Sequence, residues 1–227
     1  MSHKKNLEMI KIIARGLKDL NEDVVYIGGA TVGFFVDNPG VSEIRPTEDV
    51  DCIIEITTRL KYYQLEKKLR ELGFENKIDN PVALICRWTY SNIVVDIMPT
   101  DEAILGFSNK WYKAGIKNSQ SIKIDKNLSI KIFKLPYFLA SKIAAHLNRG
   151  ENDFRTSKDI EDFISAIAEN SNAKNDILSS DDNVRNFLLK TITDFLSNDD
   201  FIESISAHQS TQEDADNALK RLKKIIS

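Results

Sequence analysis

The sequence changes its periodicity once, near residue 135, and this change limits the folds that the chain can adopt. Before it, β-branched residues form short strand-like runs, separated by turn residues and amphipathic helical segments. From Pro136 onward, apolar residues recur at steps of three and four, which predicts a series of helices. We therefore expect an α/β (α+β) domain with a mixed sheet over residues 1–134 and a helical domain over residues 135–227.

The first part is expected to alternate helices and strands. Helices are predicted where apolar residues keep a helical period, and strands where β-branched residues cluster between turn residues. The predicted elements are a helix from Leu7 to Leu20, a strand at 24–27, a helical stretch at 30–37, a strand at 49–56, a helix at 59–72 that ends at Gly73, a hairpin of 82–90 and 92–98 that turns at Ser91 and Asn92, and strands at 121–125 and 128–134 that are separated by Lys126 and Asn127.

The second part is expected to contain four helices, over 136–150, 157–170, 181–198 and 210–227. Ser210 and Glu213 stand three residues apart at the start of the last one, the spacing of a capping box. Residues 169–183 are rich in Asn, Asp and Ser, which predicts a polar connector.

Composition excludes few classes of function. The hydrophobic share of 42% and charged share of 29% are ordinary for a soluble protein, and the net charge of −3 argues against a broadly basic nucleic-acid coat. Cys52 and Cys86 lie in apolar runs and are expected to be buried, reduced thiols rather than a disulfide or metal framework. No apolar run approaches the length of a bilayer, so we expect a cytoplasmic protein without a membrane partner.

Two aspartates stand at the start of the strand expected at 49–56, in the stretch "RPTEDVDCIIEI". Because side chains alternate between the faces of a strand, Asp49 and Asp51 point to the same side, with Cα atoms about 6.5–7 Å apart. Adjacent acids on a buried face repel each other and lose hydration, a cost that a cation offsets. Two metal ions about 3.5–4 Å apart, as in phosphoryl-transfer sites, fit this spacing.

Asp96 is the single acid in the apolar run "NIVVDIM". Neighbouring strands lie about 4.8 Å apart, so pairing of this run with residues 49–56 would bring three carboxylates together. Mg²⁺ is held in proteins by carboxylates, substrate phosphates and water. We therefore expect two Mg²⁺ ions, with Mn²⁺ as an alternative, at Asp49, Asp51 and Asp96.

Gly28 and Gly29 separate a strand from a helical stretch, where glycines let the backbone approach a ligand and leave N–H groups facing an anion. The order of glycine pair, paired aspartates and third aspartate resembles the polymerase-β-like nucleotidyltransferases. Within that superfamily the chain resembles the AbiEii-type family of abortive-infection and toxin–antitoxin systems. The likeness spans residues 26–163 and rests on three stretches: "YIGGATVGFF" is similar to that family's glycine motif, "RPTEDVD" to its Arg, Thr and paired-Asp motif, and "KIAAHLNRGENDFRTSKDIEDF" to its Lys, Arg and KD..D motifs.

The resemblance implies a role for each matching position. Asp49 and Asp51 would bind Mg²⁺, Asp96 would complete the metal site and act as a base on the acceptor hydroxyl, and Lys142 would contact phosphates as a catalytic residue. The nucleotide-binding set implied by the resemblance is Gly28, Gly29, Thr31, Arg45, Thr47, Lys142, Arg149 and Asp159. Lys142 and Arg149 are two helical turns apart on one face, about 10 Å along the axis, which suits a triphosphate gripped at two points.

The same residues also have structural interpretations. An isolated pair of aspartates is common at solvated strand ends, but the glycine pair and third aspartate favour the metal site. Asp96 also fits a salt bridge to Arg87, and Lys142 fits a surface lysine whose stem covers an apolar helix. Arg45 and Thr47 also suit a loop-shaping role, and His146 fits an ordinary helix residue better than a metal ligand.

The predicted function is Mg²⁺-dependent transfer of a nucleoside monophosphate from an NTP to an acceptor hydroxyl. Family resemblance implies a tRNA 3′ end as acceptor, a toxin-like role and an antitoxin partner. Transfer to a protein or to a small molecule such as an aminoglycoside stays open within the same chemistry. A catalytically silent nucleotide-sensing or partner-binding module is the main alternative, and two-metal hydrolysis is a third that leaves the glycine pair unexplained.

Overall fold

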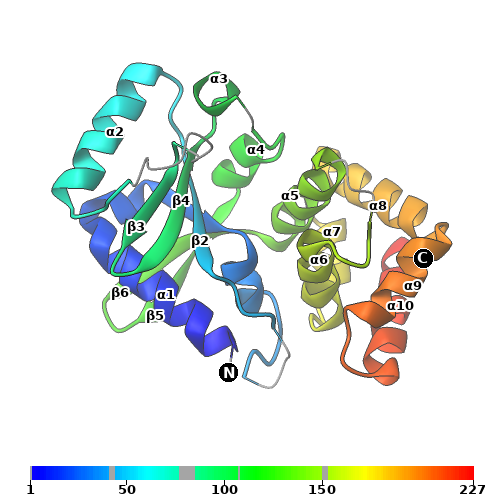
Figure 1. Cartoon of the computed structure of the whole chain (residues 1–227). Coiled ribbons are helices and arrows are strands. Elements are labelled where there is room, and N and C mark those ends of the chain that lie inside the picture. The colour runs from blue at the N-terminus through cyan, green and yellow to red at the C-terminus, as the bar shows by residue number, and fades with distance from the viewer. Residues whose placement is uncertain (1, 41–43, 77–84, 107, 150–152) are drawn as a thin grey trace. The chain divides into compact units, whose positions relative to one another are not determined.

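The computed structural model describes residues 2–40, 44–76, 85–106, 108–149 and 153–227 of the chain. It divides into two compact units (Figure 1). The first consists of Met1–Thr31 and Arg45–Phe133, and the second of Val32–Ile44 and Lys134–Ser227. The first unit contains the sheet, and the second is helical.

The sheet of the first unit is mixed, as the sequence predicts. Its six strands lie in the order β3-β4-β2-β1-β6-β5. β2 is parallel to β4 and β1 is parallel to β6, whereas the other neighbours are antiparallel. The strands are β1 (Val24–Ile27), β2 (Asp49–Ile54), β3 (Arg87–Tyr90), β4 (Ile93–Pro99), β5 (Ser119–Asp125) and β6 (Leu128–Phe133).

The long N-terminal helix packs on this sheet through the apolar stripe that the sequence predicts. Ile10, Ile13 and Leu17 share one face and are fully buried, and the helix contacts β2, β4 and β6 (Figure 1). The helical elements that begin in this unit are α1 (Ser2–Leu17), the 3₁₀ helices η1 (Lys18–Glu22) and η2 (Gly29–Phe34), α2 (Arg59–Glu71), α3 (Glu102–Leu105) and α4 (Tyr112–Lys117). The expected helical stretch at 30–37 is thus a short 3₁₀ helix, and the sequence pattern missed α3 and α4.

Turn residues end these elements where the sequence places them. Gly73 has φ +88 and follows α2, as a C-terminal stop does. Ser91 and Asn92 both have positive φ, which is the conformation of a tight hairpin turn between β3 and β4. The first residues of the strand expected at 82–90 lie outside the described residues.

The second unit is built around α5, which is buried along most of its length and packs against α6, α7 and α8. Beside this helix, the rings of Phe154, Phe163, Phe195 and Phe201 stack or meet edge to face. The helices are α5 (Leu135–Asn148), α6 (Lys158–Ala168), α7 (Ala173–Leu178), α8 (Asp182–Leu196), α9 (Asp199–Ala207) and α10 (Gln212–Ile226).

Residues 32–44 belong to the second unit, not to the first as the expected boundary at 134 implies. Phe35 packs on Phe138 with ring centroids 4.4 Å apart. Asn170 donates to the carbonyl of Phe35, and the Asp37 N–H donates to the carbonyl of Glu169. These contacts join residues far apart in the chain, so local sequence patterns do not predict them.

Two further expectations about the helical part are wrong in detail. The connector expected at 169–183 contains α7, because Ala173 and Ile177 are buried although the segment is polar overall. The cap of α10 is Thr211, one residue after the expected Ser210: its Oγ1 accepts from the N–H of Asp214 and donates to that residue's carboxylate. The sequence pattern also missed α9, although Asn198 caps the N-terminus of that helix.

Within the described ranges, none of the helices combines the length and the apolar character that crossing a membrane requires.

Candidate functional site

The three predicted metal ligands lie on one face of the sheet. In the parallel register of β2 and β4, Asp51 is beside Asp96 and Asp49 is beside Val94. Since side chains alternate along a strand, Asp49, Asp51 and Asp96 point to the same side. Asp96 is buried at 6% exposure, whereas the side chain of Asp49 is 34% exposed. The two strands therefore pair as the convergence of the acids requires, and the face remains open at Asp49.

Gly28 leaves the space that the Asp51 carboxylate occupies. Antiparallel pairing of β1 and β2 sets Ile27 beside Asp51, and the chain then turns at Gly28 with φ +75. A Cβ atom at this position would lie 1.9 Å from Asp51 Oδ2 and in a backbone conformation that side chains disfavour. The glycine is thus required twice, by its torsion angle and by the carboxylate against it.

Thr31 closes the turn that follows Gly28. Its N–H donates to the Gly28 carbonyl at 3.1 Å, and its hydroxyl donates to the same oxygen at 2.8 Å. Thr31 is 1% exposed. The structure therefore uses this hydroxyl to hold the glycine turn, and its contact with a nucleotide stays a prediction.

Thr47 orients the first aspartate of the pair. Its hydroxyl donates to Asp49 Oδ1 at 3.0 Å, and Thr47 is 5% exposed. Asn6 on α1 holds the segment from the other side, since its Oδ1 accepts from the Thr47 N–H and its Nδ2 donates to the Arg45 carbonyl, both at 3.2 Å. Asn6 was not predicted, although a polar residue four positions before Ile10 on the buried stripe of α1 is a recognisable signal.

Arg87 makes the salt bridge to Asp96 that the sequence left as an alternative. Its Nε is 2.8 Å from Asp96 Oδ1 and its Nη2 is 2.7 Å from Asp96 Oδ2, a bidentate contact. The same Nη2 is 3.5 Å from Asp49 Oδ2. The hydrogen bond to Asp96 raises the pKa of Arg87 above its ordinary range, so the guanidinium stays charged.

The two cysteines flank this site as inert, reduced thiols, which confirms their predicted burial. Burial raises the pKa of Cys52 well above its usual value, and the charges of Asp51 and Asp96 add to the effect. Burial also raises the pKa of Cys86 to about 12, with Asp96 as the next cause. Neither thiol is available as a thiolate ligand near neutral pH.

The chemistry of the donor set suits a hard divalent cation, because carboxylate oxygens are the ligands that Mg²⁺ prefers. Arg87 already places one positive charge against both Asp49 and Asp96. In this conformation, no three His, Cys, Asp or Glu side chains among the described residues surround a common point. The acids share a face through the strand register, while the guanidinium holds two of their carboxylates.

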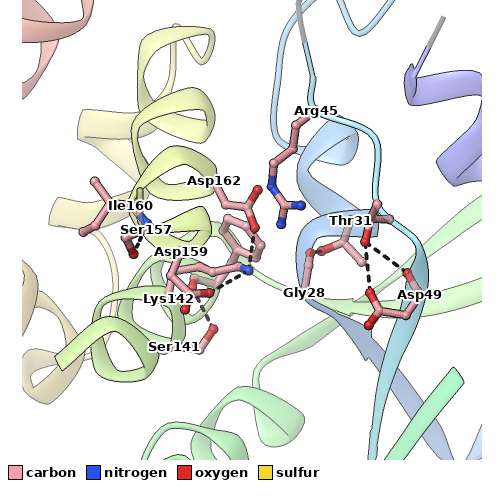
Figure 2. Close-up of polar contacts among 12 residues, drawn as sticks. Gly28, Thr31, Arg45, Asp49, Ser141, Lys142, Ser157, Asp159, Ile160 and Asp162 are labelled. Atoms are coloured by element: carbon pink, nitrogen blue, oxygen red, sulfur yellow. Dashed lines mark hydrogen bonds and ion pairs between the residues drawn. The ribbon is translucent and has the colours of Figure 1, made fainter. Parts of the chain in front are cut away.

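The other predicted site residues form a buried cluster in the second unit. Lys142 on α5 has a side chain 9% exposed, and its Nζ is 3.1 Å from Asp159 Oδ1 and 2.5 Å from Asp162 Oδ2, both on α6 (Figure 2). Arg149 Nη1 is 3.0 Å from Asp159 Oδ2. Lys142 and Arg149 do share a face, but the group between them is Asp159. Asp162 was missed as a site residue, although it is the last acid of the quoted KD..D pattern.

His146 and Ser157 lie next to this cluster and have structural partners. His146 Nδ1 is 2.9 Å from Ser157 Oγ, which also caps α6 by accepting from the Ile160 N–H. Burial lowers the pKa of His146, which keeps the ring neutral. This agrees with its interpretation as an ordinary helix residue.

Two surface hollows lie in the second unit and contain none of the predicted site residues. One, of about 600 Å³, is bounded by the corner between α6 and α7 and by the basic face of α10, with Lys174, Lys220, Arg221 and Lys224 in its wall. The other, of about 470 Å³, lies beside the loop before α10. The candidate site is the acidic face of the sheet, and neither hollow includes it.

No known protein-family model matches this chain, and no curated protein is significantly similar to it in sequence.

Proposed function

We propose that this chain is a Mg²⁺-dependent nucleotidyltransferase of the polymerase-β-like class, related to the AbiEii-type family. One observation carries the proposal: Asp49 and Asp51 on β2 share a face with Asp96 on the parallel neighbour β4, and β1 delivers Gly28 directly against Asp51. An acidic face of this kind suits a metal-bound triphosphate, because it offers oxygen ligands for the metal.

In this proposal the three aspartates would hold Mg²⁺. The bound metal would neutralise charge on the phosphates and orient the α-phosphate for in-line attack. Thr47 holds the Asp49 carboxylate in place, and Gly28 leaves room for that of Asp51. Asp96 would accept the proton of the acceptor hydroxyl while the hydroxyl oxygen bonds to the α-phosphorus and pyrophosphate leaves.

The acceptor proposed is an RNA 3′ end, with a tRNA as the first candidate and toxin-like activity, neutralised by an antitoxin, as the consequence. Transfer to a protein hydroxyl or a small molecule uses the same residues and is distinguished by where the nucleotide is attached. The proposed nucleotide contacts of Arg45, Lys142, Arg149 and Asp159 follow from the family resemblance. In the structure, Lys142 is held by two aspartates and is accessible only if that cluster opens.

A catalytically silent module is the second candidate, and one observation favours it. The bidentate contact between Arg87 and Asp96 compensates the charge of the third acid without a metal. A silent module predicts nucleotide binding without transfer, or no nucleotide binding.

The test is incubation of the purified chain with each α-³²P-labelled NTP, Mg²⁺ and total RNA or cell extract. Asp49→Asn is the inactive variant, and Asp125→Asn is the matched control, because Asp125 is an acid at the far edge of the same sheet that pairs with Arg15. We expect label on RNA with the wild type and Asp125→Asn, and a loss of at least about 100-fold in Asp49→Asn.

Label on protein or on a small molecule would keep the transferase and replace the acceptor. Absence of label from every acceptor, with nucleotide binding unchanged in Asp49→Asn, would reject the enzyme in favour of the silent module.

A further inference from the structure

Arg87 reaches the acidic face from the edge of the sheet. It begins β3, an edge strand, and lies in register with Asp96 on β4. Its guanidinium is anchored to Asp96 by two hydrogen bonds, of 2.8 and 2.7 Å, and extends toward Asp49 at 3.5 Å. The charged group thus lies against two of the three predicted metal ligands.

The two ends of this contact differ in exposure. The Asp96 side chain is 8% exposed, whereas that of Arg87 is 47% exposed. An arginine on an edge strand with half of its side chain in solvent can rotate away without opening the core. Burial holds the Asp96 carboxylate in place, so the guanidinium is the group that moves when the contact breaks.

Arg87 compensates the negative charge of the two carboxylates only in part. Asp49 and Asp96 share this one guanidinium, and neither has another ion-pair partner among the described residues. A single delocalised charge at 2.7 and 3.5 Å offsets two carboxylates less fully than a divalent cation bound directly by both. A divalent ion should therefore bind the same oxygen atoms more strongly than the guanidinium does.

We propose that Arg87 is an internal counter-ion, which neutralises Asp96 and Asp49 in the metal-free protein and is displaced when a divalent cation binds. This inference rests on the proposed metal site, and it adds that metal binding must break the Arg87 contacts. The guanidinium and the metal compete because both need Asp96 Oδ1 and Oδ2 or the space beside Asp49 Oδ2, and because two cations in that space repel each other.

The competition makes a prediction opposite to that for an arginine that supports the metal site. Removing the Arg87 charge should strengthen metal binding, since the metal no longer displaces a cation, while the metal-free protein loses stability. Saturating metal should then restore most of the lost stability, because the ion takes over the neutralisation of both carboxylates.

The experiment measures Mn²⁺ binding to the full chain without nucleotide, by the electron paramagnetic resonance signal of free Mn²⁺. The first variant is Arg87→Met, which keeps the length and removes the charge. The second is Arg87→Gln, which removes the charge but retains a hydrogen-bond donor, and it keeps the test available if Arg87→Met folds poorly. Arg15→Met is the matched control, because Arg15 makes a surface ion pair with Asp125 in the same unit. Asp49→Asn tests the metal site itself.

We expect both Arg87 variants to bind Mn²⁺ about tenfold or more tighter than the wild type, the factor that corresponds to losing a charge-assisted bidentate competitor. Arg15→Met should match the wild type and Asp49→Asn should lose binding. In thermal unfolding, Arg87→Met should melt below the wild type without Mn²⁺, and the gap should narrow with saturating Mn²⁺.

Equal or weaker Mn²⁺ binding in both Arg87 variants, with binding still lost in Asp49→Asn, would overturn the counter-ion role and leave the metal site standing. No Mn²⁺ binding by any variant, or binding that survives Asp49→Asn, would overturn the metal site and the counter-ion role together.

Discussion

Each unit of this protein gathers aspartates around a basic side chain, but the two clusters have different environments. In the sheet cluster, Asp49 and Asp96 share the guanidinium of Arg87, whose side chain is 47% exposed. In the helix cluster, the ammonium group of Lys142 lies between Asp159 and Asp162, and all three side chains are at most 9% exposed. The same residue types therefore produce an accessible cluster and an enclosed one.

The difference teaches how to separate a binding site from a structural ion pair. A buried lysine held by two carboxylates is costly to remove, because both carboxylates then lose a close cation in a buried site. An exposed arginine at a sheet edge can leave its carboxylates to an incoming cation at lower cost. Accessibility of the basic group, rather than the number of acids, distinguishes the two clusters.

The largest effect is expected from breaking the helix cluster. Lys142→Met should lower the free energy of unfolding by up to about 3–5 kcal/mol, because it removes the buried cation that Asp159 and Asp162 share, while Arg149 still compensates part of the charge of Asp159. Urea denaturation measures the change. Lys190→Met, which breaks the exposed pair with Asp194 on α8, is the control and should change stability by less than about 0.5 kcal/mol. A loss below about 1 kcal/mol for Lys142→Met would show that the helix cluster is open to water.

An intermediate effect is expected at the glycine beside the sheet cluster. Gly28→Ala places a methyl group 1.9 Å from Asp51 Oδ2 at φ +75, so we expect about 1–3 kcal/mol of destabilisation and weaker Mn²⁺ binding. Gly106→Ala is a matched control, because Gly106 has φ +80 and no described atom within 4 Å of the added methyl group. Urea denaturation and Mn²⁺ titration of both variants separate backbone strain from the contact with Asp51. If both variants lose the same stability and bind Mn²⁺ alike, Asp51 does not depend on the glycine.

The smallest effect is the acid response of the helix cluster through His146. Burial lowers the pKa of this ring in the folded protein. Below the unfolded pKa of about 6.5, the ring is therefore protonated to a greater extent in the unfolded chain than in the folded one. Stability should be unaffected by this group above pH 7 and should fall as pH drops below 6.5, by at most about 1.4 kcal/mol per pH unit. The nearby carboxylate of Asp159 opposes the shift and so reduces its size.

The measurement is urea denaturation of wild type and His146→Gln between pH 5 and pH 8. Glutamine keeps a polar group near Ser157 but does not titrate, so the variant should show a shallower loss in this range. Parallel pH profiles for the two proteins would mean that other groups carry the acid response.

Local patterns predicted much of the fold correctly. The apolar stripe of Ile10, Ile13 and Leu17 predicts the buried face of α1, and Ser91 with Asn92 predicts the hairpin turn. Helix α7 escaped prediction because only Ala173 and Ile177 of its six residues are buried, too few to show a period in a polar segment. The α10 cap was missed by one residue because Ser210 and Thr211 are adjacent and both are favoured N-cap residues.

The candidate site divides in the same way. The period of a strand is enough to put Asp49 and Asp51 on one side, and the isolation of Asp96 in an apolar run marks it as unusual. The partners of these residues are not local: Asn6 holds the segment at Arg45 and Thr47 from about 40 positions away, and Arg87 reaches Asp96 across a strand pair. Such contacts depend on strand order, which single-sequence patterns do not specify.

By itself, the sequence determined most of the strands and of the longer helices, which face of β2 is acidic and where glycine permits a turn, because these depend on periods and torsion angles over a few residues. Only the tertiary structure decided that Asp51 lies beside Asp96, that Arg87 shares its charge with Asp49, and that Lys142 is enclosed by two aspartates. The physical reason is that charge compensation depends on distance and burial, and both are set by the packing of segments remote in the chain.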